Sequence, residues 1–509
     1  MMKIMVIKMT LILDGHDMSY EMSNLCFMFF PGEKIEMAAQ GWDLSRDFIC
    51  TRLKRLGSRT CAYVTISRCG RRTRAVSYAQ NDACDYHKQC EFALGRAFYK
   101  AASQHCGFKP PWGILTGIRP AKLVRGMLAQ GAAPDEIKKR LVQERYVNEN
   151  KAKLCVETAA REERIVRLSR RGSVSLYISI PFCPTRCLYC SFISAEIERN
   201  KKLLPDYIRL LCQELEATGS IINALGLRLE TIYMGGGTPT ALSAQSLTEI
   251  FDTVKKSFNL DTLREYTVEA GRPDTITEGK LAAIKLGGAA RICINPQTLD
   301  DDILKSIGRS HTAQQVFEAM KLARAAGFGS INMDIIAGLP GDTLSGFEKT
   351  LDGVIALKPE GVTVHSLAMK RSSRLVTGGN AVWDARGTVA NAMLELAAKK
   401  LGGAGLAPYY LYRQRNTIGN LENVGYALEG YECLYNIFIM DETHTILSVG
   451  AGGVTKMKAP YTGHIERIFN FKYPDEYIKR FNEILERKKQ VGKFYDDNDW
   501  KNKDIADIC

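Results

Sequence analysis

Six short apolar runs recur between residues 174 and 367, and helical patterns separate them. The runs, read as strands, cover residues 175–180, 229–234, 265–270, 290–295, 329–335 and 361–367. Short, nearly continuous apolar runs are typical of parallel strands buried on both faces. The clearest helical pattern, at residues 201–218, repeats leucine and isoleucine every three or four positions. Six strand–helix units predict a parallel α/β barrel or partial barrel.

The first 172 residues predict an α+β region. Strand character occurs at residues 1–13, 25–30 and 60–67. Helical patterns cover residues 85–104, 120–130, 135–145 and 156–170. The segment Arg170-Arg-Gly172 then separates this region from the first barrel strand.

After residue 370 the pattern changes again and predicts a small α+β domain. It contains a helix at 390–401, a turn region at 427–434, strands at 435–440 and 445–449, and an amphipathic helix at 477–489. A chain of 509 residues is too long for one ordinary core. We therefore expect three parts: residues 1–172, a barrel at 173–370 and a substrate-side capping domain at 371–509.

Composition indicates a globular protein without a membrane span. Hydrophobic residues make up 45% of the chain, and no apolar run reaches the 18 residues that a spanning helix needs. Lys8 interrupts the apolar start, so residues 1–13 favour a strand over a signal peptide. The 15 cysteines without an export signal favour a reducing, cytoplasmic setting and an anaerobic host.

The charge is distributed unevenly. Residues 1–172 carry 30 Lys/Arg against 17 Asp/Glu, whereas the remaining residues carry 39 of each. One interpretation is a docking face for an acidic partner, such as a flavodoxin or a nucleic acid. A solvated basic surface without a partner is the more ordinary interpretation.

Three cysteines lie in one loop, Cys183-Pro-Thr-Arg-Cys187-Leu-Tyr-Cys190, directly after the first barrel strand. Three thiolates can hold three irons of a four-iron cube and leave the fourth iron open to a ligand. Active sites of α/β barrels lie at the carboxyl ends of the strands, where this loop stands. Zinc is the alternative, but it normally takes a fourth protein ligand, and the position two after Cys190 is Phe192.

Other residues suited to ligand binding also lie at strand ends. They are Gly235–Gly237, Glu269, Asn295–Gln297 and Asp334. Glycines allow a ligand to approach the backbone closely, and the following Thr238 adds a hydroxyl. A carboxyl group in an apolar stretch, such as Glu269, needs a partner or a ligand; a salt bridge to Arg272 or Arg291 is the structural alternative.

The cysteine loop resembles that of the radical S-adenosylmethionine (SAM) superfamily. Four segments resemble the oxygen-independent coproporphyrinogen III oxidase family: residues 177–183, Gly235-Gly-Gly-Thr-Pro-Thr240, residues 291–298 and residues 332–340. Three more, residues 111–120, 422–427 and 449–456, resemble its HemZ-type dehydrogenase branch.

This resemblance implies a partial (β/α)6 barrel with a [4Fe-4S] cluster on Cys183, Cys187 and Cys190. It implies one or two bound SAM molecules, contacted by Tyr177, Gly236, Gly237, Thr238, Glu269, Gln297, Arg309, Asp334 and Ala368. The implied reaction cleaves SAM and takes hydrogen from two propionate arms of coproporphyrinogen III. Loss of CO2 from each arm gives protoporphyrinogen IX. A low-potential donor such as flavodoxin or ferredoxin is implied as a partner.

A tetrapyrrole with four carboxylates requires cationic partners, and arginine suits carboxylates best. The candidates are Arg309, Arg371, Arg374, Arg413 and Arg415, the last two beside the aromatic run at residues 409–412. An aromatic core patch with solvated arginines explains these residues equally well. His311 and His365 are candidates for proton transfer or carboxylate binding, although a structural role is more usual for a single histidine.

Two positions depart from the pattern of the principal oxidases. Phe192 stands where those enzymes carry a further cysteine, and the haem-chaperone branch also has an aromatic residue there. Cys293 stands where relatives often carry serine. Two alternatives therefore stay open: a haem-binding chaperone, and a radical SAM enzyme acting on another substrate, with an RNA-linked role among the options.

Overall fold

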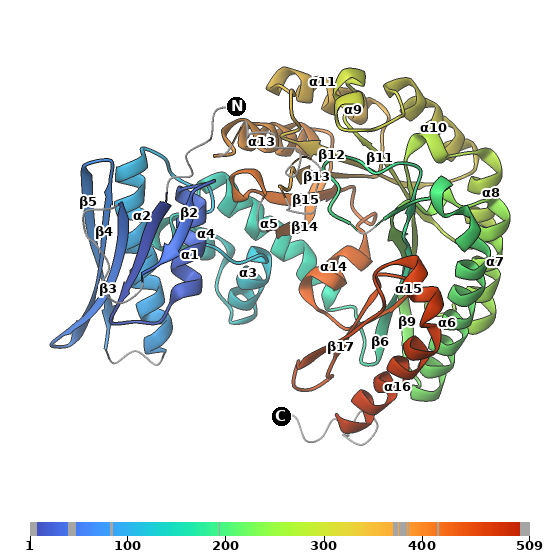
Figure 1. Cartoon of the computed structure of the whole chain (residues 1–509), viewed down its shortest axis with the longest axis horizontal. Helices are drawn as coiled ribbons and strands as arrows, with labels where there is room; N and C mark the ends of the chain where they lie inside the picture. Colours follow the sequence, from blue (N-terminus) through green and yellow to red (C-terminus); the bar gives the residue numbers. More distant parts are fainter. Residues whose placement is uncertain are drawn as a thin grey trace. The chain divides into compact units, whose positions relative to one another are not determined.

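The computed structural model describes residues 8–38, 47–81, 85–192, 194–369, 375, 384, 386–414 and 417–498. The chain forms two compact units (Figure 1). The first unit contains Met1–Glu157, Ala381–Asn391 and Arg413–Glu422, and the second contains Thr158–Asn380, Ala392–Tyr412 and Asn423–Cys509. The three-part division expected along the sequence stays a prediction.

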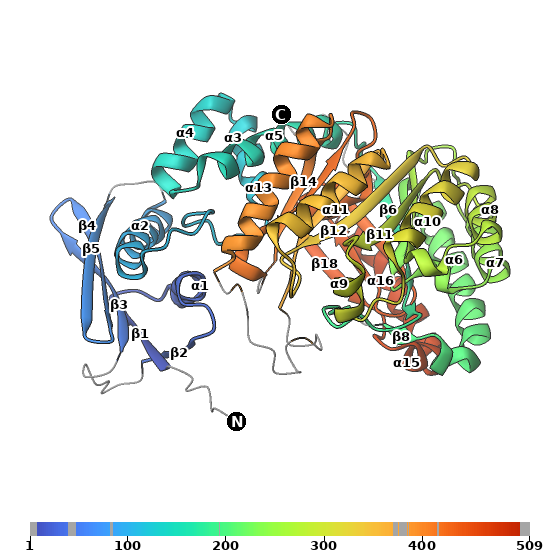
Figure 2. The ribbon, with the colours of Figure 1, turned by 90° about the horizontal axis from the view of Figure 1, so that it is seen from above.

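The first unit contains a five-stranded sheet in the order β2-β1-β3-β4-β5. Its strands are β1 (Lys8–Asp14), β2 (Lys34–Met37), β3 (Phe48–Leu56), β4 (Arg59–Arg68) and β5 (Arg71–Gln80). Strand β1 runs parallel to β2 and β3, whereas β3, β4 and β5 form an antiparallel meander. Helices α1 (Ser19–Phe29) and α2 (Tyr86–Cys106) lie on the same side of this sheet (Figures 1 and 2).

The core of the first unit lies between this sheet and the two helices. Alternate residues of β4, among them Val64 and Ile66, are fully buried, as are Leu94 and Phe98 of α2. The period of two directs every second side chain of a strand to the helix-covered face. Helices α3 (Pro120–Ala129) and α4 (Pro134–Arg145) follow, and then α5 (Glu149–Val166), which begins in the first unit and continues into the second.

The second unit contains six parallel strands, and the predicted partial barrel is confirmed. They are β6 (Ser173–Ile180), β9 (Arg228–Gly236), β10 (Glu265–Gly271), β11 (Arg291–Gln297), β12 (Ser330–Ala337) and β13 (Gly361–Ser366). The helices between them lie on the outside of the curved sheet (Figure 1). They are α6 (Leu204–Leu225), α7 (Ala244–Ser257), α8 (Glu278–Leu286), α9 (Asp301–Ser306), α10 (Ala313–Ala325) and α11 (Leu344–Ala356).

C-terminal elements extend the barrel sheet at both edges. Strand β16 (Thr445–Val449) pairs parallel with β6 and is followed by β17 (Val454–Lys458) and β18 (Ile465–Phe469). At the other edge β15 (Glu422–Ala427) pairs antiparallel with β13, and β14 (Ala407–Arg413) lies beyond β15. The α-helices described after residue 386 are α13 (Thr388–Gly403), α14 (Leu434–Asp441), α15 (Pro474–Lys479) and α16 (Phe481–Asp497). Among the described helices, none is both long and apolar enough to cross a membrane.

Two predicted strands are wrong. Residues 25–30 belong mainly to helix α1, and residues 435–440 lie within helix α14. The first turn of α14 is stabilised from outside, because the Glu265 carboxylate accepts hydrogen bonds from the backbone N–H groups of Leu434 (2.6 Å) and Tyr435 (3.3 Å). A carboxylate at a helix N-terminus satisfies free N–H groups and complements the helix dipole. This tertiary contact overrides the strand preference of the segment.

Other boundaries differ as well. The predicted helix at 156–170 begins earlier, at Glu149, and ends at Val166. The terminal helix predicted at 477–489 is two helices, α15 and α16. Strands β3 and β5 were not predicted, because basic residues interrupt their apolar pattern. The helices at 85–104, 120–130, 135–145 and 390–401 and the strands at 60–67 and 445–449 are confirmed within a few residues.

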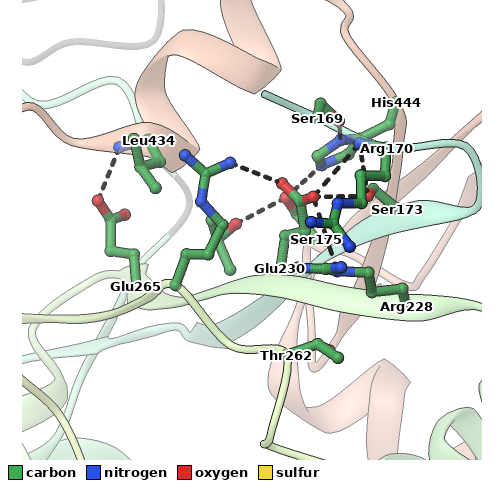
Figure 3. A network of polar contacts seen from close by, with 12 residues as sticks. Ser169, Arg170, Ser173, Ser175, Arg228, Glu230, Thr262, Glu265, Leu434 and His444 are labelled. Carbon is green, nitrogen blue, oxygen red and sulfur yellow. Dashed lines mark hydrogen bonds and ion pairs between the residues drawn. The ribbon is translucent and has the colours of Figure 1, made fainter. Parts of the chain in front are cut away.

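Polar groups close the amino edge of the barrel sheet (Figure 3). The Glu230 carboxylate is fully buried and accepts hydrogen bonds from the Ser173 hydroxyl (2.6 Å) and the Arg264 guanidinium (3.2 Å). Arg228 lies 3.9 Å from the same carboxylate. A buried carboxylate is tolerated only where charged and hydrogen-bonding partners surround it. This edge is therefore filled by the protein's own polar groups.

His444 joins β16 to this edge. Its Nε2 atom lies 2.8 Å from the Ser175 hydroxyl and its Nδ1 atom 3.0 Å from the Ser169 hydroxyl. Burial, together with the nearby positive charges of Lys458 and Arg264, lowers the pKa of His444 to about 3. The folded protein thus holds this imidazole neutral, whereas the unfolded chain protonates it near pH 6.5.

We predict that His444 makes the fold acid-sensitive. Its folded pKa is lowered, so the unfolded state binds one more proton between about pH 6.5 and pH 3, and stability falls as the pH falls through that window. Between pH 7.5 and pH 5 this costs about 2 kcal/mol. Urea unfolding, followed by circular dichroism at both pH values, compares the wild type with His444→Gln. We expect the variant to be less stable than the wild type at pH 7.5, but its free energy of unfolding should fall by about 2 kcal/mol less between pH 7.5 and pH 5. An equal fall in both proteins would contradict the role of His444.

Candidate active site

The three cysteines lie at the carboxyl edge of the barrel, as predicted. The short strand β7 (Phe182–Cys183) comes directly after β6 and ends at Cys183. It pairs with β8 (Ala195–Glu196). Cys187 and Cys190 follow in the connecting loop, and all three are free thiols. Cys183 and Cys190 each interact electrostatically with Cys187, so the three cysteines lie near one another.

Two of the three thiols, Cys183 and Cys190, have raised pKa values. Burial raises the pKa of Cys183, and it raises the pKa of Cys190 to about 11. Metal ligation requires thiolates, so binding of iron releases protons. Three thiols suit a four-iron cube with one open iron. Among the described residues, no group of three or more His, Cys, Asp or Glu side chains converges as a single metal ion requires.

Two buried arginines anchor the cysteine loop. Arg272, which follows β10, donates from Nη1 to the Thr185 hydroxyl (2.6 Å) and forms an ion pair with Asp274 (2.8 Å). Arg309, which follows α9, donates to the Tyr189 hydroxyl (3.0 Å) and to a backbone carbonyl of β11. The structural alternative for Glu269, a salt bridge to Arg272 or Arg291, is not found for either arginine. Arg272 pairs with Asp274, and Arg291 donates to the Tyr431 carbonyl (2.7 Å).

The glycine run after β9 is pressed against the cysteine loop. Gly236 has a φ of +109°, and a Cβ on Gly237 would lie 2.5 Å from the Phe182 carbonyl oxygen. The N–H of Gly237 donates to the Ile180 carbonyl (2.8 Å), and that of Thr238 to the Phe182 carbonyl (2.7 Å). The Thr238 hydroxyl also contacts the Cys183 sulfur at 3.5 Å. Only glycine permits this approach, which leaves a cradle without side chains beside the thiols.

Glu269 lies beside this cradle. A Cβ on Gly235 would lie 2.8 Å from its carboxyl carbon, and the Tyr233 hydroxyl donates to its Oε1 atom at 2.7 Å. Burial raises the pKa of Glu269 to about 7, although the Tyr233 hydrogen bond opposes the shift. The negative charge of Asp334 raises it as well. This carboxyl group is therefore about half ionised at neutral pH, and a bound cation would keep it ionised.

The next strand, β11, presents polar atoms without partners. The side-chain oxygens of Asn295 and Gln297 are buried and accept no hydrogen bond from any described residue. Gln297 has a φ of +70°, an uncommon conformation for a non-glycine residue. Buried acceptors without donors are costly and require an explanation. The edge predicted to bind SAM thus offers a glycine cradle, a carboxyl group and free acceptors, which fit an amino-acid-bearing cofactor.

Asp334 and His365 meet on neighbouring strands. Asp334 accepts a hydrogen bond from the Asn332 side chain (2.7 Å), and His365 Nε2 lies 3.7 Å from its other oxygen. The predicted structural role of His365 agrees with this contact. Ala368 follows β13 and is partly buried. His311 is buried next to Arg309, where burial lowers its pKa to about 4.

Tyr177 belongs to a tyrosine stack. Its ring lies 5.9 Å from that of Tyr435 and 6.2 Å from that of Tyr233, and these two are 4.6 Å apart. Burial raises the pKa of Tyr177, so its hydroxyl stays protonated and can donate. Sequence reasoning missed Tyr435, since it was assigned to a strand. Cys293 is buried, and burial raises its pKa, which makes it a poor nucleophile.

The predicted substrate arginines are not brought together in the described part of the chain. Arg371, Arg374 and Arg415 lie outside the described residues. Arg413 is buried in the first unit, where it donates to the carbonyls of Leu115 and Asn420 and lies over the Trp112 ring. In the aromatic run, Tyr409 and Tyr410 are buried in a hydrophobic core. Both observations support the structural interpretation of these residues.

We predict that Arg272 holds the cluster loop in place. In Arg272→Gln the bonds to Thr185 and Asp274 are weakened, so the loop becomes looser and iron is retained less well. After anaerobic reconstitution, iron and sulfide content and the rate of iron loss to a chelator are measured. We expect the variant to lose iron to the chelator about tenfold faster than the wild type, which is equivalent to about 1.4 kcal/mol of lost loop stabilisation. The matched control is Arg264→Gln, which weakens the ion pair with Glu230 at the amino edge of the barrel; similar iron loss in both variants would contradict a specific anchor.

The chain is similar to known proteins over most of its length. Residues 177–354 match the family model described as the radical SAM superfamily. Over 404 residues the chain is 38% identical to the oxygen-independent coproporphyrinogen-III oxidase-like protein HemZ of Bacillus subtilis, covering 79% of this chain and 81% of that protein. It is also 30% identical to the heme chaperone HemW of Haemophilus influenzae over 63% of this chain and 79% of that protein.

Among solved structures, the coproporphyrinogen III oxidase HemN of Escherichia coli has a similar fold. The TM-score is 0.50 at 21% identity, and the match covers 65% of this chain and 73% of that structure. The chain belongs to the radical SAM superfamily, whose members use a [4Fe-4S] cluster and SAM, and within it to the oxygen-independent coproporphyrinogen-III oxidase-like proteins of the HemZ type.

Proposed function

We propose that the protein is a coproporphyrinogen dehydrogenase, which oxidatively decarboxylates coproporphyrinogen III to protoporphyrinogen IX without oxygen. The observation that carries this proposal is the 38% identity to a HemZ protein over 81% of that protein's length. The thiols, the glycine cradle and Glu269 at one edge of the barrel supply the donor set that radical chemistry with SAM needs. A low-potential donor such as flavodoxin or ferredoxin and a cytoplasmic location belong to the same proposal.

Each group of residues has a distinct task in this proposal. Cys183, Cys187 and Cys190 hold the cluster, and the cradle of Gly236, Gly237 and Thr238 receives the amino-acid end of SAM. Bound together, cluster and SAM supply a radical that abstracts hydrogen from an unactivated carbon.

The remaining residues orient SAM and keep water out. Glu269 pairs with a positive charge of SAM, and Gln297, Arg309, Asp334 and Ala368 complete the proposed contacts to one or two SAM molecules. The stack of Tyr177, Tyr233 and Tyr435 forms an apolar wall beside Glu269 that excludes water from this edge.

A haem-binding chaperone is the second candidate, and one residue favours it. Phe192 stands two positions after Cys190 and is 65% exposed. A single exposed aromatic side chain is ordinary on a protein surface, so Phe192 favours this candidate through its match to the aromatic residue at this position in the haem-chaperone branch. Relatives named heme chaperone are also similar to this chain, among them HemW of Bacillus subtilis at 36% identity over 38% of this chain. In this alternative the cluster and the fold are kept, and haem is bound and delivered instead of being made.

One anaerobic assay separates these candidates. The reconstituted protein receives reductant, SAM and coproporphyrinogen III, and 5′-deoxyadenosine and vinyl-bearing tetrapyrroles are quantified by mass spectrometry. We expect about two deoxyadenosines per protoporphyrinogen, since each vinyl group requires one hydrogen abstraction. Cys187→Ala should abolish both products. Deoxyadenosine without any vinyl product would contradict the dehydrogenase, and tight stoichiometric haem binding with transfer to an apo-acceptor would then support the chaperone.

We further predict that SAM affinity depends on the ionisation of Glu269. Its pKa of about 7 means that the carboxylate fraction, and with it the attraction for a cation, rises with pH. We expect SAM to bind roughly tenfold more tightly at pH 8 than at pH 6. Equilibrium dialysis with the reconstituted protein measures this profile.

Tyr233→Phe provides the direct test of this titration. It removes the hydrogen bond that lowers the pKa of Glu269, so the midpoint of the profile moves to higher pH. Tyr435→Phe is the matched control, because it removes a hydroxyl from the same tyrosine stack without removing that hydrogen bond. A flat profile in the wild type, or equal shifts in both variants, would contradict the role of Glu269.

A further inference from the structure

The sheet of the first unit has one face that α1 and α2 do not cover. The register of β3, β4 and β5 places Arg52, Tyr63 and Val76 opposite one another, and all three side chains point away from the buried residues Ala62 and Val64. The next row on the same face contains Lys54, Cys61 and Tyr78. We call this surface the basic sheet face, and its most exposed members are Arg52, Lys54, Tyr63, Arg72, Arg74 and Tyr78.

On β3, β4 and β5 the basic sheet face carries only basic charges. Residues 48–80, which form β3, β4 and β5, contain eight Lys/Arg residues and no Asp or Glu. Five of the eight lie on the basic sheet face: Arg52, Lys54, Arg59, Arg72 and Arg74. Arg52 forms an ion pair with Asp14 of β1 at 2.5 Å. In the described part of the chain, no carboxylate pairs with Lys54, Arg72 or Arg74. A solvated surface usually mixes both signs of charge, so an all-basic meander indicates attraction to a polyanion.

Two exposed tyrosine rings lie among these charges. Tyr63 is 38% exposed and Tyr78 is 51% exposed, although each stands in the middle of a regular strand. Cys61 pairs with Tyr78, and Tyr63 is two residues further along β4, so the two tyrosines are diagonal neighbours on one face. Diagonal neighbours on a sheet are close enough for large side chains to act together. The face thus combines flat aromatic surfaces with cations.

We propose that the basic sheet face binds single-stranded nucleic acid. Phosphates would pair with Lys54, Arg72 and Arg74, and two successive bases would stack on Tyr63 and Tyr78. Sheet faces with exposed aromatic residues among basic side chains recognise single strands in this way, and stacking tolerates any base sequence. A duplex buries its bases and offers these rings nothing to stack on. An acidic protein would use the charges but would leave the rings without a role.

Binding is measured with the full-length protein and a fluorescently labelled 12-nucleotide oligouridine. Each phosphate contact in a single strand contributes about −0.7 to the slope of log affinity against log salt. Three to four contacts predict a slope of about −2.5, or a loss of about thirtyfold between 50 and 200 mM salt. A labelled duplex of the same length and an oligoglutamate of similar charge serve as competitors. We expect both to compete at least tenfold more weakly than the single strand.

Two pairs of variants separate a built surface from general charge. Lys54→Glu/Arg74→Glu should weaken oligouridine binding strongly and reduce the salt slope by about 1.4, which corresponds to two contacts. Lys100→Glu/Lys139→Glu makes the same change of charge at exposed positions of α2 and α4 and should have little effect. Tyr63→Ala/Tyr78→Ala should weaken binding at least tenfold, whereas Tyr63→Phe/Tyr78→Phe keeps the stacking surfaces and should retain it.

Three outcomes would overturn the proposal. The first is the absence of binding to oligouridine up to about 100 μM at 50 mM salt, which is the range of non-specific binding. The second is equal loss of binding in the two charge variants, which would show general electrostatic attraction. The third is competition by oligoglutamate as effective as that by the single strand, which would point to an acidic protein partner. Circular dichroism confirms that each variant is folded.

Discussion

The candidate site depends on a loop that has little regular structure but must hold three thiols in one place. Burial raises the pKa values of Cys183 and Cys190, so these thiols provide no attraction that would hold the loop in place before metal binds. Its position comes from Arg272 and Arg309, which bind Thr185 and Tyr189 within the loop. Both arginines follow strands or helices of the barrel. The two guanidinium groups therefore fix the position of the cysteine loop relative to the rigid parallel sheet.

The two edges of the barrel differ in how their polar groups are satisfied. At the amino edge, Glu230 and His444 find partners within the protein, and the surrounding serines and arginines complete the network. At the carboxyl edge, the oxygens of Asn295 and Gln297 have no partner among the described residues, and Glu269 is held near its midpoint of ionisation. The protein stabilises one edge at folding and leaves the other to be completed by a ligand. A dehydrogenase and a haem chaperone of this family would both need such a ligand-binding edge, so the contrast between the edges does not separate the two functions.

The sequence predicted the barrel well because its signals are local. Each strand is a short apolar run, and the three cysteines lie within eight consecutive residues. The hydrophobic period and the position along the chain were therefore enough to predict the strands and the loop. The structure adds what depends on distant residues. Helix α14 exists because Glu265, far away in the sequence, caps its first turn, and this helix brings Tyr435 to Tyr177. No local pattern contains that contact. The pairing of Arg272 with Asp274 instead of Glu269 was hidden for another reason, because the direction of a side chain at a strand end is set by packing.

The basic first unit shows why charge must be read together with direction. From composition alone, an excess of Lys and Arg is most simply a solvated surface, and β3 and β5 were missed because those residues interrupt their apolar pattern. Once the strands are known, alternation separates the same residues into two sets. Ala62, Val64 and Ile66 face the helices, while the tyrosines and most of the cations face the other way. A random solvated surface has no reason to place two large aromatic rings side by side among like charges, since each exposed ring costs free energy. The arrangement is explained if a ligand with both phosphates and flat rings covers it.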